Sequence, residues 1–149
     1  MCSYGQSIES DGDNFMQKPL VTIGISFFNN QDTLDDAITS VINQSFSDWE
    51  LILIDGGSID QSLAVAQQYH DNRITLISDG HYRGFVECLN QSVTLAAGKY
   101  YARMDADDVM HPERLEQQVT FLAIHPDVDI VDTTMYVMNQ AGELTGERR

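Results

Sequence analysis

Four short runs rich in β-branched and aromatic residues alternate along the chain with stretches of helical periodicity. The runs cover residues 20–28, 49–54, 73–78 and 99–104, and each leads into polar or glycine-containing residues. Between them, apolar residues recur every three to four positions, which is the spacing of one helix face. Alternation of this kind is typical of a parallel sheet covered by helices on both faces. We therefore predict an α/β, three-layer, Rossmann-like fold.

The third helical stretch carries its apolar residues at Phe85, Leu89, Val93 and Ala96. This spacing predicts that these four side chains form the buried face of the third helix. Gly98 follows directly and is suited to end that helix.

The last part of the chain predicts one more helix and one more strand. Pro112 suits the first position of a helix, and residues 127–138 form another apolar run. Residues 139–142 are typical of a turn.

Charge and composition exclude several classes of function. The chain has 23 acidic and eight basic residues, a net charge of −15, which argues against binding to nucleic acid or to anionic membrane surfaces. It has no run of about 18 apolar residues, so we predict no membrane span.

Residues 1–18 are polar and lack a signal-peptide pattern, which predicts a flexible tail before a domain at 19–149. Cys2 and Cys88 have no metal-type spacing, and a cytoplasmic location fits them best.

Three aspartates stand where the fourth run ends. Asp105, Asp107 and Asp108 repel one another, and the carboxyl end of a strand is where ligands bind open α/β sheets. Hard cations such as Mg²⁺ or Mn²⁺ take oxygen ligands and share them with substrate phosphates. The cluster therefore indicates a metal site, although a solvated acidic turn at the start of a helix explains the same pattern.

The loops that directly follow the other predicted strands, here called their exits, extend this candidate site. The exits at 28–30, 55–58 and 78–80 meet the aspartate cluster at one edge of the predicted sheet, as a nucleotide pocket requires. Asp55 alone also fits a tight turn closed by its own side chain. Neither G-x-G-x-x-G nor G-x-x-x-x-G-K-[ST] is present, so a metal held by Asp107 is the natural way to handle phosphate charge.

Several ordered segments resemble family 2 glycosyltransferases of the GT-A fold. They are D-G-G-S-I-D at 55–60, A-R-M-D-A-D-D at 102–108, which contains a D-x-D motif, and H-P-E-R-L-E-Q-Q at 111–118. The resemblance extends from residue 20 to about 141. It implies the amino-terminal, donor-binding part of a truncated GT-A domain.

The resemblance also implies roles for individual residues. Asp55 would contact the nucleobase, Asp105 the ribose or sugar, and Asp107 the Mn²⁺ or Mg²⁺ that bridges the diphosphate. Asp105 would also be a second metal ligand. The resemblance further implies a UDP-linked donor and a metal-dependent, inverting transfer to a saccharide or lipid-linked acceptor. The expected nucleotide-sugar site consists of Phe28, Asn29, Asp55, Gly57, Ser58, Asp79, Asp105 and Ala106.

Two departures and two alternatives accompany this resemblance. Gly56 stands where the family has a second aspartate, and Leu89 where it has an arginine. The implied catalytic base is expected beyond Arg149, so the catalytic residue is not assigned and the isolated chain is expected to be inactive. Asp105 to Val109 also fits the D-x-D-x-[TV] pattern of aspartate-nucleophile phosphatases, and a non-catalytic nucleotide-binding remnant is the other alternative.

Overall fold

The computed structural model describes residues 18–139 and 141–148, so the predicted tail lies almost wholly outside the described residues. Its centre is a four-stranded, all-parallel sheet with the strand order β3-β2-β1-β4. The strands are β1 (Val21–Phe27), β2 (Trp49–Asp55), β3 (Ile74–Ile77) and β4 (Tyr100–Asp105). The parallel sheet predicted from the alternating pattern is confirmed.

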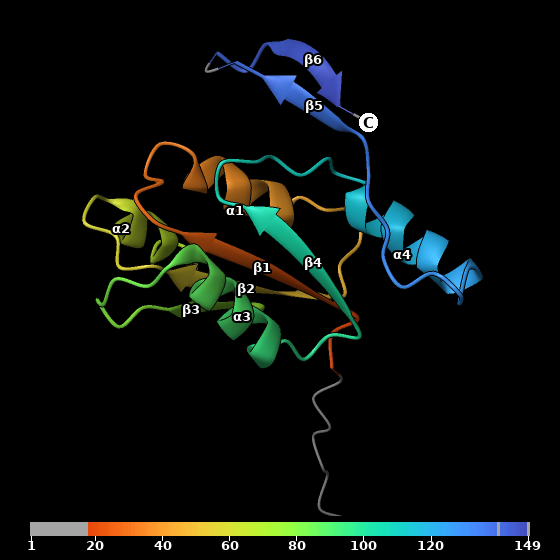
Figure 1. The fold of residues 1–149 in the computed structure, drawn as a ribbon, viewed down its shortest axis with the longest axis horizontal. Helices are drawn as coiled ribbons and strands as arrows, with labels where there is room; N and C mark the ends of the chain where they lie inside the picture. The colour runs from red at the N-terminus through yellow and green to blue at the C-terminus, as the bar shows by residue number, and fades with distance from the viewer. Residues whose placement is uncertain (1–17, 140, 149) are drawn as a thin grey trace, which may run out of the picture.

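Helices cover both faces of this sheet (Figure 1). They are α1 (Leu34–Ile42), α2 (Ser62–Ala66), α3 (Phe85–Leu95) and α4 (Arg114–Ile124). The main core joins side chains of α1, α2 and α4 to one face of β1 and β2, while α3 covers the opposite face. Burial of this apolar surface is the main force that holds the layers together.

The buried face of α3 differs from the predicted one. Cys88 and Ser92 are buried, whereas Phe85 and Val93 are about half exposed. The cause lies in β1, where a Cβ atom on Gly24 would overlap the Tyr101 hydroxyl and lie 2.9 Å from the Ser92 Oγ. The small face of α3 therefore sits close to the sheet, and the apolar stripe points elsewhere.

Gly98 has a different role from the predicted one. The helix already ends at Leu95, and Gly98 has no left-handed backbone angle. Its N–H donates to the Thr22 hydroxyl at 2.9 Å, and a Cβ atom would lie 2.5 Å from the Thr22 nitrogen. Glycine is required here because two backbone segments pass in close contact.

The strand predicted at residues 127–138 is mostly wrong. Only β5 (Met135–Met138) forms, and it pairs antiparallel with β6 (Leu144–Arg148), which the sequence did not predict, in a separate exposed sheet. The turn predicted between them is confirmed, because Gly142 adopts a φ of 79° and its N–H donates to the Asn139 carbonyl. Pro112 lies just before α4, whose N-cap is Glu113. Within the described residues, no helix is long and apolar enough to cross a membrane.

Candidate functional site

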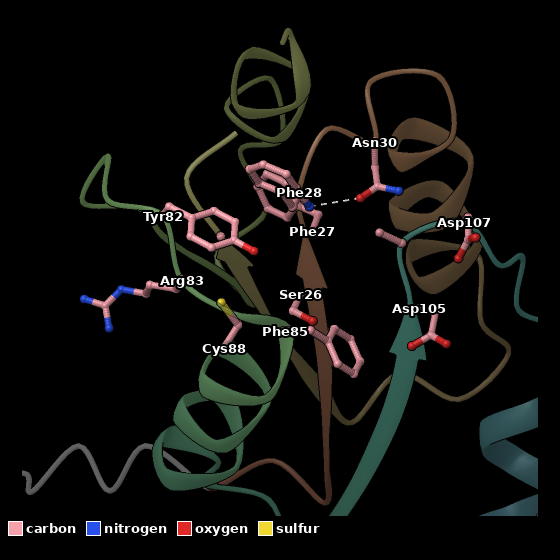
Figure 2. A pocket seen from close by; sticks show the side chains of 12 residues that line it. Ser26, Phe27, Phe28, Asn30, Tyr82, Arg83, Phe85, Cys88, Asp105 and Asp107 are labelled. Carbon is pink, nitrogen blue, oxygen red and sulfur yellow. Dashed lines mark hydrogen bonds between the residues drawn. The ribbon is translucent and has the colours of Figure 1, made fainter. Parts of the chain in front are cut away.

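The strands β1, β2 and β4 end side by side, and their exits border a cleft of about 360 Å³ (Figure 2). Register places Phe27 of β1 opposite Asp55 of β2, and Ser26 opposite Asp105 of β4. The predicted meeting of these exits at one sheet edge is therefore confirmed. The cleft is lined by Ser26, Phe27, Phe28, Asn30, Gly56, Tyr82, Arg83, Phe85, Cys88, Asp105, Ala106 and Asp107.

One end of the cleft is acidic. β4 ends at Asp105, and the turn that follows is held by the Thr33 hydroxyl, which donates to the Ala106 carbonyl at 3.0 Å. Asp107 is exposed and makes no hydrogen bond or ion pair within the described part of the chain. Desolvation, followed by the nearby charges of Asp105 and Asp107, raises the pKa of the Asp108 carboxyl above its ordinary value.

Asp105 is paired with an arginine from its own strand. The Arg103 Nε and Nη2 groups donate to the Asp105 carboxylate at 2.8–3.1 Å. The guanidinium carbon also lies 5.2 Å from the centre of the Phe85 ring, at the start of α3. Side chains two apart on a strand share one face, which explains why Arg103 and Asp105 meet beneath Phe85.

The other end of the cleft is aromatic. Phe28 and Tyr82 meet edge to face, with ring centroids 5.2 Å apart, on the side opposite Asp105 and Asp107 (Figure 2). Tyr82 is 75% exposed and Phe28 43%, although both are large rings. Two exposed rings at one cleft offer apolar faces to a flat ligand.

The loop that carries Tyr82 is fixed to the turn after β2. The Arg83 N–H donates to the Gly56 carbonyl at 2.9 Å. Gly57 has a φ of 89°, and a Cβ atom there would lie 2.7 Å from the His81 carbonyl and the Tyr82 Cα. Arg83 also pairs with Asp79, which lowers the pKa of that carboxyl to about 2.

The Asp55 carboxylate forms hydrogen bonds within the protein. Its side chain is buried, and Oδ1 accepts the N–H groups of Gly57 at 3.2 Å and Ser58 at 2.8 Å. Oδ2 accepts the Ser78 hydroxyl at 2.8 Å. This is the side-chain-closed turn that the sequence offered as an alternative, and Asp55 does not line the cleft.

The exit of β1 is tied to the same turn. Asn29 has a φ of 57°, and its N–H donates to the Ser58 hydroxyl at 3.1 Å. Its side-chain oxygen accepts the Ile59 N–H at 2.9 Å. Asn29 and Ser58 thus join two strand exits into one rigid rim.

The predicted site residues fall into two groups. Phe28, Asp105, Ala106 and Asp107 line the cleft, whereas the others lie behind it and support it: Asn29, Asp55, Gly57, Ser58 and Asp79. The sequence reasoning missed Tyr82, Phe85 and Arg103. Phe85 was assigned to the core by its spacing. Tyr82 lies in a predicted loop, and the one signal that could have identified it is an aromatic residue at a position expected to be exposed.

The donor set at the acidic end suits a hard cation that shares its ligands with a substrate. Within residues 18–139 and 141–148, no three His, Cys, Asp or Glu side chains converge enough to hold a metal ion. Asp105 and Asp107 offer carboxylate oxygens only. Mg²⁺ is commonly held by one or two carboxylates together with substrate phosphates, and these two residues fit that arrangement.

The parallel sheet and the cleft at its carboxyl edge define an α/β protein with a candidate ligand site at the ends of its strands. The sequence model described as "Glycosyl transferase family 2" matches residues 22–148. The chain therefore belongs to glycosyltransferase family 2, as its segments indicated. This membership leaves no support for the phosphatase interpretation of Asp105.

Two curated proteins are examples of the relatives of this chain. "Putative glycosyltransferase EpsE" of Bacillus subtilis (strain 168) is 39% identical over 83% of this chain and 46% of its own. The Escherichia coli protein named "UDP-Glc:alpha-D-GlcNAc-diphosphoundecaprenol beta-1,3-glucosyltransferase WfgD" is 29% identical over 72% of this chain and 42% of its own. The chain thus spans less than half the length of these curated relatives.

Solved structures share the fold. Staphylococcus aureus TarS 1–349 in complex with UDP-GlcNAc matches with a TM-score of 0.65 and 20% identity, over 71% of this chain and 32% of that one. The Pyrobaculum calidifontis mannosyltransferase PcManGT, in complex with GDP-Man and Mn²⁺, gives 0.64 and 23%, over 72% and 33%. The matched part of this chain shares the GT-A fold of these two structures.

Proposed function

We propose that residues 19–149 form the part of a glycosyltransferase that binds a nucleoside diphosphate sugar, most simply a UDP-sugar. The observation that carries the proposal is a single cleft with an aromatic end, at Phe28 and Tyr82, and an acidic end, at Asp105 and Asp107. A nucleotide sugar has a flat base at one end and a charged diphosphate beyond it. The base would lie at the aromatic end and the diphosphate toward the aspartates.

We propose that Asp107 and Asp105 hold Mn²⁺ or Mg²⁺ in the loaded site. A bound divalent cation would neutralise the negative charge that develops on a departing nucleoside diphosphate. The two aspartates lie at the end of β4, and the Ala106 carbonyl between them accepts a hydrogen bond from Thr33, which holds the backbone of this turn. The complex of PcManGT with GDP-Man and Mn²⁺ supports this assignment.

The residues behind the cleft would orient the donor. Asp55 and Ser58 shape the turn that carries Gly56 to the cleft wall, and Asp55 would contact the base if its carboxylate reaches past that turn. Asn29 fixes Phe28 at the aromatic end through its bonds to the same turn. Asp79 restrains the loop of Tyr82 by its pair with Arg83.

For the whole protein we propose an inverting transfer to a hydroxyl of a saccharide or lipid-linked acceptor, carried out in the cytoplasm. The name of WfgD, which includes a diphosphoundecaprenol acceptor, supports a lipid-linked substrate. The general base for the acceptor hydroxyl is proposed to lie outside residues 1–149, since the chain spans less than half the length of its curated relatives.

Calorimetry with UDP, GDP, ADP and CDP tests the donor proposal directly. We expect UDP to bind with Mn²⁺ or Mg²⁺ and to bind much more weakly in the presence of a chelator. Equal binding with and without chelator would contradict the metal role. No binding of any nucleoside diphosphate would contradict the donor site as a whole.

A further inference from the structure

The cleft has to accept a diphosphate although its acidic end already carries several negative charges. A cationic side chain at that end is therefore significant. The described basic residues are Lys18, Arg73, Arg83, Lys99, Arg103, Arg114 and Arg148.

Three of these basic residues are excluded by where their charges lie. Arg83 lines the cleft, but its guanidinium pairs with Asp79 and Glu87 and points away from the cleft (Figure 2). Arg114 is half-buried, donates to the Arg103 carbonyl and interacts electrostatically with Asp132 and Asp108, neither of which lines the cleft. Lys99 lies at the other end of β4, next to Tyr100.

Arg103 carries a guanidinium that contacts the acidic end of the cleft directly, through Asp105. It is held on two sides, by the Asp105 carboxylate at 2.8–3.1 Å and by the Phe85 ring at 5.2 Å. Both partners line the cleft. The Arg103 side chain is 52% exposed, so its terminal group can turn without disturbing the core.

The pairing of Arg103 with Asp105 conflicts with the role proposed for Asp105. Both carboxylate oxygens accept hydrogen bonds from the guanidinium, and Asp105 can approach a divalent cation freely only when this positive group moves aside. A guanidinium released from Asp105 would still rest on Phe85, which lines the cleft. Its planar donor fork suits the oxygens of a phosphate.

We propose that Arg103 is a positioning residue that exchanges partners when the donor binds. In the free protein it holds Asp105 in place. In the loaded site, Asp105 ligates the cation and Arg103 donates to an anionic oxygen of the nucleoside diphosphate, while Phe85 keeps the guanidinium beside the cleft. This inference rests on the proposed metal-assisted binding of a nucleoside diphosphate.

The chain contains a matched control for this arrangement. Arg73 pairs with Asp71, also two residues away, and its guanidinium lies 3.7 Å from the centre of the Trp49 ring. Arg73 precedes β3 and Trp49 begins β2, so this second arginine–carboxylate–aromatic group lies at the opposite end of the sheet. Substitution of Arg73 removes the same kinds of contact far from the cleft.

The test uses two titrations on the wild type, Arg103→Gln and Arg73→Gln. The first measures Mn²⁺ alone by electron paramagnetic resonance, and the second measures UDP at saturating Mn²⁺ by calorimetry. We expect Arg103→Gln to bind Mn²⁺ alone severalfold more tightly, because Asp105 loses its competitor. We expect the same variant to bind UDP about tenfold or more weakly, which corresponds to one charge-assisted hydrogen bond. Arg73→Gln should change neither affinity.

Tighter Mn²⁺ binding together with weaker UDP binding in Arg103→Gln distinguishes the exchange of partners from a merely structural role. If Arg103 only holds Asp105 in place, Mn²⁺ and UDP affinities fall together, and the inference is wrong. Unchanged UDP affinity also overturns it. If Arg103→Gln fails to fold, Arg103→Lys is tested by the same two titrations. This variant keeps the positive charge but loses the planar fork of donors, so we expect it to weaken UDP binding about threefold.

The wild-type titration separates this inference from the function on which it rests. Absence of Mn²⁺-assisted UDP binding to the wild type contradicts the proposed function and the exchange with it. Normal wild-type binding, with UDP affinity unchanged in Arg103→Gln, contradicts the exchange alone.

Discussion

Replacement of Asp55 tests whether this buried carboxylate supports the turn that shapes the cleft. In Asp55→Ala the N–H groups of Gly57 and Ser58 lose their acceptor, and so does the Ser78 hydroxyl. In Asp55→Asn one oxygen remains to accept both N–H groups. The new amide then faces the Ser78 hydroxyl, which can rotate to accept a hydrogen bond.

The magnitude follows from these three hydrogen bonds. A hydrogen bond to a charged group contributes roughly 1.5–3 kcal/mol, but Gly57 and Ser58 are only half-buried and Ser78 is exposed, so water replaces part of the loss. We therefore expect Asp55→Ala to lower the free energy of unfolding by about 3 kcal/mol. This corresponds to a fall in Tm of roughly 10 °C for a chain of this length. Asp55→Asn should cost about 1 kcal/mol, because only one hydrogen bond changes.

The assay is urea unfolding of the wild type and both variants, with the exposed Asp127→Ala as the control that should stay within about 0.5 kcal/mol. An Asp55→Ala protein as stable as the wild type would refute the reasoning, and so would an Asp55→Asn protein as unstable as the alanine variant. Asp55→Asn also probes the proposed base contact. A clear loss of UDP affinity in a variant of nearly normal stability would point to direct contact with the nucleotide.

Three further predictions concern the two ends of the cleft and the loop beside it. Asp107→Asn should remove the gain in UDP affinity that Mn²⁺ gives to the wild type, measured by calorimetry with and without chelator, and a retained gain would argue against Asp107 as a ligand. Tyr82→Ala should weaken UDP binding by roughly 1–3 kcal/mol through lost stacking, whereas the exposed Tyr136→Ala should leave it unchanged; equal affinities in both would count against a base at the aromatic end. Because Arg83 lowers the pKa of Asp79 to about 2, the contribution of this pair to stability is present above pH 3.8 and is lost as the pH falls through about 2. Arg83→Gln should return the carboxyl pKa toward its ordinary value in a carbon-13 NMR titration, and an unmoved titration would show that Arg83 is not the cause.

The sheet could be predicted from the sequence because its signals are local. The runs that became β1 to β4 are short, β-branched and separated by helical periodicity, and the parallel direction of the strands follows from this alternation of strands and helices. The meeting of Asp55 and Asp105 at one edge then needs only the rule that parallel strands end together. Local pattern and global fold agree in this part of the chain.

The orientation of α3 could not be predicted in the same way. Its apolar stripe at Phe85 and Val93 is a stronger pattern than the small face at Cys88 and Ser92. Which face is buried depends on a partner strand, where Gly24 leaves room for Ser92 and for the Tyr101 hydroxyl. Periodicity within a helix contains no information on that neighbour.

At the aromatic end of the cleft Phe28 was predicted, but Tyr82 was missed for a related reason. Tyr82 reaches the cleft because the Arg83 N–H bonds the Gly56 carbonyl and because Gly57 lets the loop pass without a clash. These contacts join segments about 25 residues apart and lie in a loop, where sequence patterns carry little geometric information. The acidic end, by contrast, was evident because its three aspartates are contiguous with the strand that positions them.

The charge of the cleft favours a divalent cation in the function proposed. The chain has a net charge of −15, and the acidic end concentrates Asp105, Asp107 and Asp108 within four residues. A diphosphate placed there meets like charges well within the screening length of about 8 Å at physiological ionic strength. Arg103 offsets one of these charges and is already paired with Asp105. The remaining repulsion is relieved when a divalent cation lies between the carboxylates and the phosphates, so the residues that appear least suited to an anion are those that would bind it.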